Sequence, residues 1–246
     1  MELRRKNMKL SRLIFISALL FSSSAQARVY TPEEISKHVG YSSIYEHLGL
    51  DSKLAISVNA YAYPDGYTMQ MSAPFVNYTK INRWLRGLPI DDFTGGSLVE
   101  KIKQVIQDVD FVIQQSHQLP QDLILFRGTN LAWRKSLYEV GDEFSDLAYI
   151  SSSLDYQIAG RFMNAKDLAV IYVIYSDHSF HGLWMSPVEK EVLLPRNTVF
   201  RVMKSIPFGG WGKVTAQIIQ LCPATGCAKE IPEDRGDVLE VLSSLR

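Results

Sequence analysis

The stretch VEKEVLLP, residues 188–195, places two glutamates, Glu189 and Glu191, at the head of an apolar run. Residues 189–194 are predicted to form a β-strand, in which side chains two positions apart point to the same face, about 7 Å apart along the backbone. Both carboxylates are therefore predicted to face one site, with Lys190 pointing the other way. Two acids at this spacing can divide labour, one stabilising a reacting group while the other handles a proton or a nucleophile. The alternative is the solvated face of an edge strand.

The composition is that of a globular protein with a core of its own. The chain has 246 residues, of which 46% are hydrophobic and 21% are charged. Lys and Arg together number 26, as do Asp and Glu, so the formal net charge is zero. Without a basic field to attract phosphates, nucleic acid is not an expected partner.

Residues 1–27 have the pattern of a secretory signal peptide. A basic segment leads into a short apolar core over residues 13–21, and an Ala-x-Ala sequence ends at Ala27. We expect cleavage after Ala27, and a secreted, monomeric, single-domain protein over residues 28–246. The apolar core is too short to span a bilayer stably and no later segment reaches that length, so no stable membrane insertion is expected.

The chain has two cysteines, Cys222 and Cys227, which lie five positions apart. Export permits disulfides, so we predict a local disulfide that closes a small loop. A thiol nucleophile or half of a metal site is the alternative, and neither has a neighbouring histidine to support it.

The chain changes character near Pro120. Before it, helices are predicted from Thr31 through Leu48, over residues 74–87, and along a long apolar stripe over residues 97–113. After it, the predicted elements are strands at residues 123–127, 147–151, 168–175, 189–194, 199–203 and 215–221, with one helix near 155–163. Helices followed by strands indicate an α+β domain with a largely antiparallel sheet or sandwich.

Two further segments carry polar side chains at predicted strand ends. Arg127 ends an apolar strand and is followed by Gly128. The planar guanidinium suits a phosphate or a carboxylate, and a structural salt bridge is the alternative. Residues 151–153 are three serines whose hydroxyls could hold a catalytic carboxylate, although a turn is the usual explanation of such a triplet.

Taken in chain order, three segments resemble the Arg, Ser-Thr-Ser and Glu-x-Glu motifs of arginine-specific mono-ADP-ribosyltransferase toxins. They are LFRG at 125–128, YISSSL at 149–154 and EKEVLLP at 189–195. Upstream, YTKINRWLR at 78–86 looks like the NAD-contacting helix of the enzymatic components of the clostridial binary toxins. The pattern departs from the family at Ser152, where Thr is usual. The nearest candidate for the aromatic residue expected before the two acids is Trp184, further upstream than the family pattern has it.

The resemblance implies a split β-sandwich with helices packed on it from the N-terminal part and a central cleft for NAD. NAD would be the co-substrate, no metal would be needed, and the second partner would be an arginine of a host protein. The residues that would contact NAD by this resemblance are Tyr78, Asn82, Arg127, Gly128, Ser151 and Glu191.

The resemblance also implies a division of roles among the catalytic residues. Arg127 would bind the NAD phosphates and Ser151 would orient Glu191. Glu191 would stabilise the oxocarbenium-like state as nicotinamide leaves, the kind of help that glycosidase carboxylates give. Glu189 would engage the incoming guanidinium, which is protonated at neutral pH and needs a carboxylate to orient it and accept a proton. An NAD glycohydrolase side activity is expected.

Two other function classes fit part of the pattern. A secreted glycosidase also uses paired carboxylates, but it does not explain Arg127 or the serine triplet. In a non-enzymatic secreted binding module, the Glu189 and Glu191 pair would be only a solvated strand edge. The histidines His178 and His181 are the only pair that suggests a metal, and with no acid or third histidine beside them a loop is the simpler interpretation.

Overall fold

We describe the protein from a computed structural model. The structure describes residues 28–39, 53–62, 76–90, 96–130, 136–163, 169–176, 178–186, 190–208, 214–223 and 226–227. Glu189 and residues 1–27 lie outside the described residues, so the predictions that concern them stay predictions.

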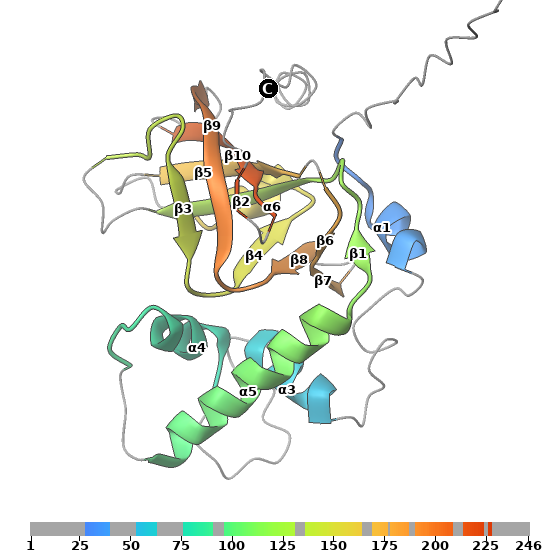
Figure 1. Cartoon of the computed structure of the whole chain (residues 1–246), viewed down its shortest axis with the longest axis vertical. Helices are drawn as coiled ribbons and strands as arrows, with labels where there is room; N and C mark the ends of the chain where they lie inside the picture. Colours follow the sequence, from blue (N-terminus) through green and yellow to red (C-terminus); the bar gives the residue numbers. More distant parts are fainter. Residues whose placement is uncertain are drawn as a thin grey trace, which may run out of the picture.

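Among the described residues, four helices precede the main strands and a fifth lies among them (Figure 1). The helices are α1 (Pro32–Val39), α3 (Lys53–Ala62), α4 (Tyr78–Leu85), α5 (Gly96–Gln115) and α6 (Tyr156–Gly160). Thr31 begins α1 as predicted, because its hydroxyl accepts from the Glu34 backbone N–H while the Glu34 carboxylate accepts from the Thr31 backbone N–H. Helix α3 has no counterpart among the predicted elements.

In the part of the chain that the structure describes, eight strands form one sheet in the order β3-β9-β10-β5-β2-β4-β8-β7, and two short strands, β1 and β6, form another. The strands are β1 (Gln118–Leu119), β2 (Ile124–Asn130), β3 (Glu143–Asp146), β4 (Ile150–Ser153), β5 (Ala169–Tyr175), β6 (Phe180–His181), β7 (Leu183–Ser186), β8 (Glu191–Leu194), β9 (Thr198–Phe208) and β10 (Val214–Leu221). All described pairings in the large sheet are antiparallel except that of β10 with β5. The predicted α+β class and largely antiparallel sheet are confirmed.

The sheet is nearly divided in two between β2 and β4. Strand β2 pairs with β5 over all seven of its residues, but it meets β4 at one pair alone, Phe126 opposite Ser153. Beyond Phe126 the two strands separate, so the group β4-β8-β7 forms a second half that is joined to the first at one point. This is the split sheet that the resemblance implied.

Helices α3, α4 and α5 lie together on one side of the strands (Figure 1). The predicted stripe on α5 is buried at each of its seven positions: Leu98, Ile102, Val105, Ile106, Val109, Val112 and Ile113. It packs with α3 and α4 and with side chains of β7, β8 and the segment before β4 into one cluster. The helical layer is therefore fixed against the β4-β8-β7 half, where the serine triplet and Glu191 lie.

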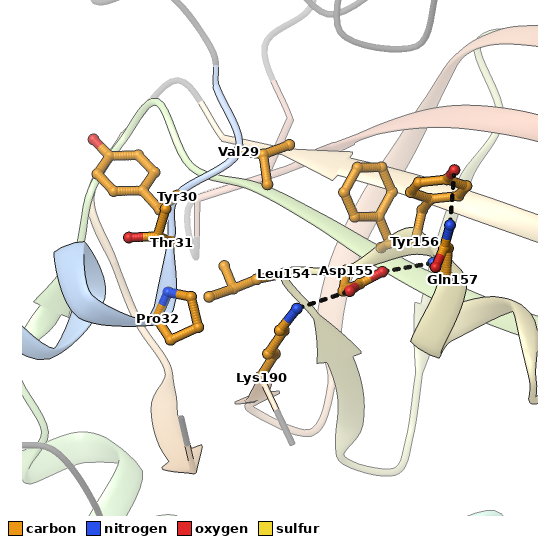
Figure 2. Close-up of a pocket in the computed structure, with 10 residues that line it drawn as sticks. Val29, Tyr30, Thr31, Pro32, Leu154, Asp155, Tyr156, Gln157 and Lys190 are labelled. Carbon is orange, nitrogen blue, oxygen red and sulfur yellow. Dashed lines mark hydrogen bonds and ion pairs between the residues drawn. The ribbon is translucent and has the colours of Figure 1, made fainter. Parts of the chain in front are cut away.

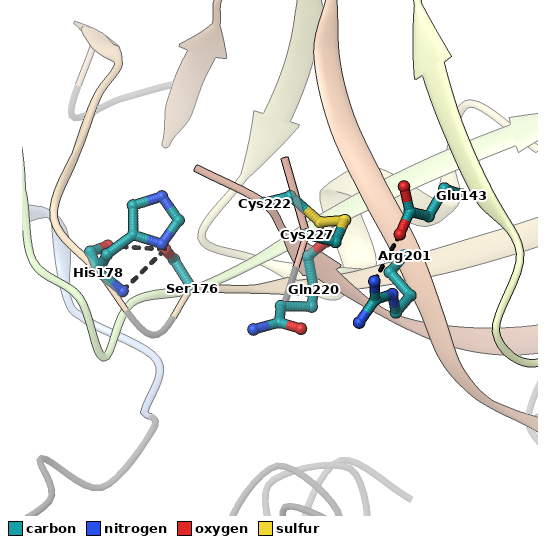
Figure 3. Close-up of a disulfide and its surroundings, with 7 residues drawn as sticks. All are labelled: Glu143, Ser176, His178, Arg201, Gln220, Cys222 and Cys227. Carbon is teal, nitrogen blue, oxygen red and sulfur yellow. Dashed lines mark hydrogen bonds and ion pairs between the residues drawn. A yellow bond between two sulfur atoms is a disulfide. The ribbon is translucent and has the colours of Figure 1, made fainter. Parts of the chain in front are cut away.

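The predicted disulfide between Cys222 and Cys227 is present, with Cα atoms 4.8 Å apart (Figure 3). Cys222 follows β10 directly, and its backbone N–H donates to the Val199 carbonyl oxygen in β9 at 2.9 Å. The disulfide thus closes its loop at the end of the β9-β10 pair. Within the described ranges, no helix is long and apolar enough to cross a membrane.

Candidate active site

Arg127 lies at the point where β2 and β4 separate. It is one residue beyond the Phe126 to Ser153 pair and in the middle of β2, because the strand continues to Asn130. The prediction that Arg127 ends its strand was therefore wrong. Where backbone pairing between β2 and β4 stops, the half-buried Arg127 side chain connects the two strands. Its Nη1 donates to the Ser151 carbonyl oxygen at 2.6 Å.

Ser151 and Glu191 meet through the register of β4 and β8. Ser153 lies opposite Glu191 and Ser151 lies opposite Leu193, so Ser151 and Glu191 are diagonal neighbours on one face. The Ser151 Oγ donates to the Glu191 Oε1 at 2.5 Å. Arg127, Ser151 and Glu191, which come from three segments of the sequence, are thus linked in one chain of hydrogen bonds.

The Glu-x-Glu segment differs from the predicted strand. Strand β8 begins at Glu191, and Lys190 lies in a turn with φ of 51°, in the left-handed region. The alternation of a regular strand therefore does not extend back through Lys190, and a shared face for Glu189 and Glu191 does not follow from strand geometry. The Lys190 Nζ lies 2.9 Å from the Asp155 Oδ2.

The helical layer adds Tyr61 of α3 and Asn82 of α4. The Asn82 Nδ2 donates to the buried Tyr61 hydroxyl at 3.2 Å. Burial raises the pKa of the Tyr61 phenol well above its ordinary value, and the hydrogen bond from Asn82 opposes this shift. The charge of Glu191 raises the same pKa further, whereas the charge of Arg127 lowers it. Tyr61 therefore lies within electrostatic range of both predicted catalytic groups, with Asn82 bonded to it, although the sequence analysis did not identify Tyr61.

Arg86, which directly follows α4, brings a second guanidinium to the same region. It forms a two-pronged ion pair with Asp146, with Nε to Oδ1 at 2.9 Å and Nη2 to Oδ2 at 2.6 Å. Burial lowers the pKa of Arg127; the charge of Asp146 opposes this shift and the charge of Arg86 adds to it. Arg127 is in no ion pair among the described residues, so the structural salt bridge considered from the sequence is not seen there. Two arginines near one another suit an anion with several oxygens, such as a pyrophosphate.

Gly128 lies on the opposite face of β2 from Arg127, toward α6. A Cβ atom at Gly128 would lie 2.0 Å from the Ala159 backbone oxygen, so α6 packs against the bare backbone here. The glycine is explained by the close approach of a helix, and any contact of Gly128 with NAD would have to come from its backbone.

The other predicted site residues have different positions. Tyr78 begins α4 one turn before Asn82 and is 38% exposed. Trp184 lies in β7 and is 1% exposed within the main core cluster, so it is not placed to contact a target protein. Ser152 is also buried, on the face of β4 away from Ser151.

The two histidines that suggested a metal site, His178 and His181, have polar partners on the chain. The His178 Nδ1 lies 3.1 Å from the Ser176 Oγ, and the His181 Nδ1 lies 3.0 Å from the Ser116 carbonyl oxygen. Across the described part of the chain, no group of three or more His, Cys, Asp or Glu side chains could hold a metal ion.

The fold matches a known class of structures. No protein-family model matches the sequence, and no curated protein is significantly similar to it. Solved structures do match, and they show that the chain has the ADP-ribosyltransferase fold, as the resemblance implied.

The Vis toxin, an ADP-ribosyltransferase from Vibrio splendidus, matches over 80% of this chain and 86% of its own, with a TM-score of 0.57 and 19% identity. The C3 exoenzyme of Clostridium limosum matches over 80% of this chain and 98% of its own, with a TM-score of 0.56 and 16% identity. The enzymatic component of the Clostridium botulinum C2 toxin matches 76% of this chain and 47% of its own, with a TM-score of 0.52 and 16% identity.

Proposed function

We propose that the protein is a secreted mono-ADP-ribosyltransferase that transfers ADP-ribose from NAD to arginine of a host protein, with NAD glycohydrolase activity as a side reaction. The observation that carries the proposal is the hydrogen-bonded chain from Arg127 through Ser151 to Glu191 at the split in the sheet. The fold shared with ADP-ribosyltransferases supports it.

Arg127 is proposed to bind the pyrophosphate of NAD. Among the described residues, its guanidinium makes one hydrogen bond, to the Ser151 carbonyl, and a guanidinium has five N–H donors in all. Arg86 lies in the same region as a second guanidinium, with its charge balanced by the ion pair with Asp146. The Ser151 carbonyl thus fixes the phosphate-binding group relative to the strand that also orients Glu191.

Glu191 is proposed to stabilise the positive charge that develops on the nicotinamide ribose. As the bond from the ribose C1′ to nicotinamide breaks, its electron pair leaves with nicotinamide, and the carbon resembles an oxocarbenium ion. The hydrogen bond from Ser151 holds the Glu191 carboxylate in one orientation before the charge appears, so little reorganisation is needed.

Glu189 is proposed to act on the acceptor. A guanidinium nitrogen forms the new bond to C1′ and releases one proton, which a carboxylate can accept. Water needs less positioning, which explains why hydrolysis of NAD would accompany transfer.

The release of nicotinamide from NAD, measured with no sugar present, tests this class of function. The proposal predicts release that rises with enzyme concentration. A glycosidase would not consume NAD, and a non-enzymatic binding module would bind it or ignore it without turnover. The measurement therefore separates all three function classes considered from the sequence.

Replacement of Arg127 by Ala is expected to weaken NAD binding by about tenfold or more, because a hydrogen bond to a charged group contributes roughly 1.5–3 kcal/mol. The thermal midpoint of unfolding should change little, since the side chain is half-buried and bonds one backbone carbonyl. NAD titration and thermal unfolding on the same preparation measure both effects.

Arg201→Ala is the matched control. Arg201 is 5% exposed and paired with Glu143, so its loss should lower stability and leave NAD affinity unchanged. A large fall in the thermal midpoint of Arg127→Ala with unchanged NAD affinity would contradict the proposed role of Arg127.

Export is proposed to remove residues 1–27 and to leave Cys222 and Cys227 joined. Arg28, the first residue after the expected cleavage site, pairs with Leu123, and its backbone N–H donates to the Asp122 carbonyl oxygen at 2.8 Å. Cleavage after Ala27 would therefore leave these contacts in place. Intact mass of the exported protein, with and without reduction and alkylation, measures both points. A different first residue, or alkylation of both cysteines without reduction, would contradict the proposal.

A further inference from the structure

Lys190, between the two predicted catalytic acids, has an unusual backbone conformation. Its φ of 51° lies in the left-handed region, which a residue with a long side chain adopts only when its surroundings hold it there. Lys190 is also the residue at which the chain enters β8, directly before Glu191. The residue before Lys190 in the sequence is Glu189.

Two contacts hold Lys190, one through its backbone and one through its side chain. The Lys190 carbonyl oxygen accepts from the Leu154 backbone N–H at 2.9 Å. The Lys190 Nζ donates to the Asp155 Oδ2 at 2.9 Å, and Figure 2 shows this pair on the wall of an open pocket of about 510 Å³. Both side chains are only partly exposed, at 37% and 25%.

Asp155 is itself fixed by the start of α6. Its second carboxylate oxygen, Oδ1, accepts from the Gln157 backbone N–H at 2.8 Å as the N-cap of the helix. Its backbone N–H donates to the Oγ of Ser153, the residue that lies opposite Glu191 in the sheet. Burial opposes ionisation of Asp155, but the hydrogen bonds from Lys190 and from Gln157 hold its pKa below the ordinary value. The carboxylate is therefore charged at neutral pH.

Helix α6 in turn is packed against the strand that carries Arg127. Gly128 leaves no room for a side chain between β2 and the Ala159 backbone oxygen. The Lys190 side chain is thus anchored to an element whose position is fixed relative to Arg127. The ion pair connects the turn between the acids to the part of the fold that is proposed to hold NAD.

We propose that the ion pair between Lys190 and Asp155 is a positioning device that favours transfer to a guanidine over hydrolysis by water. Glu191 is held independently, by the register of β8 and by Ser151. Glu189 precedes Lys190 by one peptide bond, so its placement depends on the conformation of Lys190. A guanidinium acceptor must be oriented, whereas water needs little orientation, so a loosened turn should impair transfer first. This inference rests on the proposed function.

The test compares the ratio of transfer to hydrolysis in matched variants of the mature protein, with agmatine as the guanidine and NAD at saturation. Lys190→Met removes the charge and keeps the apolar stem. Asp155→Asn removes the charge and keeps a residue that caps helices well. Lys190→Gly suits the left-handed backbone but has no side chain to pair. Lys103→Met, which breaks the exposed pair with Glu100 on α5, is the control.

We expect Lys190→Met, Asp155→Asn and Lys190→Gly each to lower the ratio of transfer to hydrolysis by about tenfold. The double variant Lys190→Met with Asp155→Asn should show the loss of one single variant, because both remove the same interaction. Lys190→Arg should restore most of the ratio, and Lys103→Met should leave it unchanged. Thermal unfolding of each variant accompanies the assay.

Three results would overturn the inference. Transfer and hydrolysis could fall together in step with the thermal midpoint, which would show a structural role alone. The ratio of transfer to hydrolysis could stay at the parent value in Lys190→Met, a variant that leaves the Asp155 N-cap of α6 unchanged. Lys190→Gly could behave as the parent, which would show that the backbone conformation matters and the ion pair does not. A parent protein that consumes no NAD would instead overturn the proposed function, and the inference with it.

Discussion

Glu191→Gln is expected to reduce NAD hydrolysis and transfer to agmatine together, by about 10²–10³-fold. The substitution preserves the shape of the side chain, and the amide oxygen can still accept from the Ser151 Oγ, which lies 2.5 Å from the Glu191 carboxylate. What is lost is the negative charge that stabilises the ribose as nicotinamide departs. Initial rates of nicotinamide release and of agmatine modification measure the two reactions.

The control for Glu191→Gln is Glu100→Gln on the exposed face of α5, where no effect is expected. Affinity for NAD should change little in Glu191→Gln, because the carboxylate acts mainly in the transition state. If the variant kept rates within a few fold of the parent, Glu191 would be only a residue at the start of β8, and the proposed mechanism would be wrong.

Glu189→Gln is expected to abolish transfer to agmatine while leaving much of the NAD glycohydrolase activity. The charge at Glu191 and its hydrogen bond to Ser151 remain, so departure of nicotinamide is still assisted. The acceptor guanidinium loses the carboxylate that orients it and accepts its proton, whereas water needs neither to the same degree. The same two rates measure the effect, and they should diverge by about 10²-fold.

A Glu189→Gln variant that transfers to agmatine as well as the parent would refute the role of Glu189, even if the protein proved to consume NAD. Equal loss of both activities would also contradict the division of labour, because it would make Glu189 part of the bond-breaking step. The pair of variants therefore tests the mechanism as a pattern of two rates.

The parts of the fold that follow from hydrophobic periodicity were predictable from the sequence. The stripe on α5 and the fully buried strand β5 form where the pattern places them, because long regular patterns leave few alternatives. Helix α3 was missed because Lys53–Ala62 mixes small, polar and apolar residues without a clear stripe. With it, Tyr61 was missed as a neighbour of the site. Strand β3 is short, polar and at the sheet edge, so it carries little strand signal.

The contact between Ser151 and Glu191 was predictable only through the resemblance, because it depends on the register between β4 and β8. Around this contact, the structure differs from the sequence-based prediction at positions where tertiary packing determines the conformation. Arg127 is predicted to end its strand, but the strand continues to Asn130, and Gly128 makes room for α6. No glycine or asparagine in the sequence indicates the turn at Lys190, because an ion pair with Asp155 holds the left-handed conformation there. Trp184 is buried, and no local pattern distinguishes an aromatic of the core from one that contacts a partner.

The most direct test of the central claim is a single incubation of the mature protein with NAD and agmatine, followed by mass analysis of the agmatine. The account predicts agmatine that is heavier by one ADP-ribose unit, formed together with nicotinamide. The Glu191→Gln variant should form neither product. Nicotinamide release without any modified agmatine would contradict arginine-type transfer and leave an NAD glycohydrolase. Unchanged NAD and unchanged agmatine would contradict the assignment of Arg127, Ser151 and Glu191 as the active site of an ADP-ribosyltransferase.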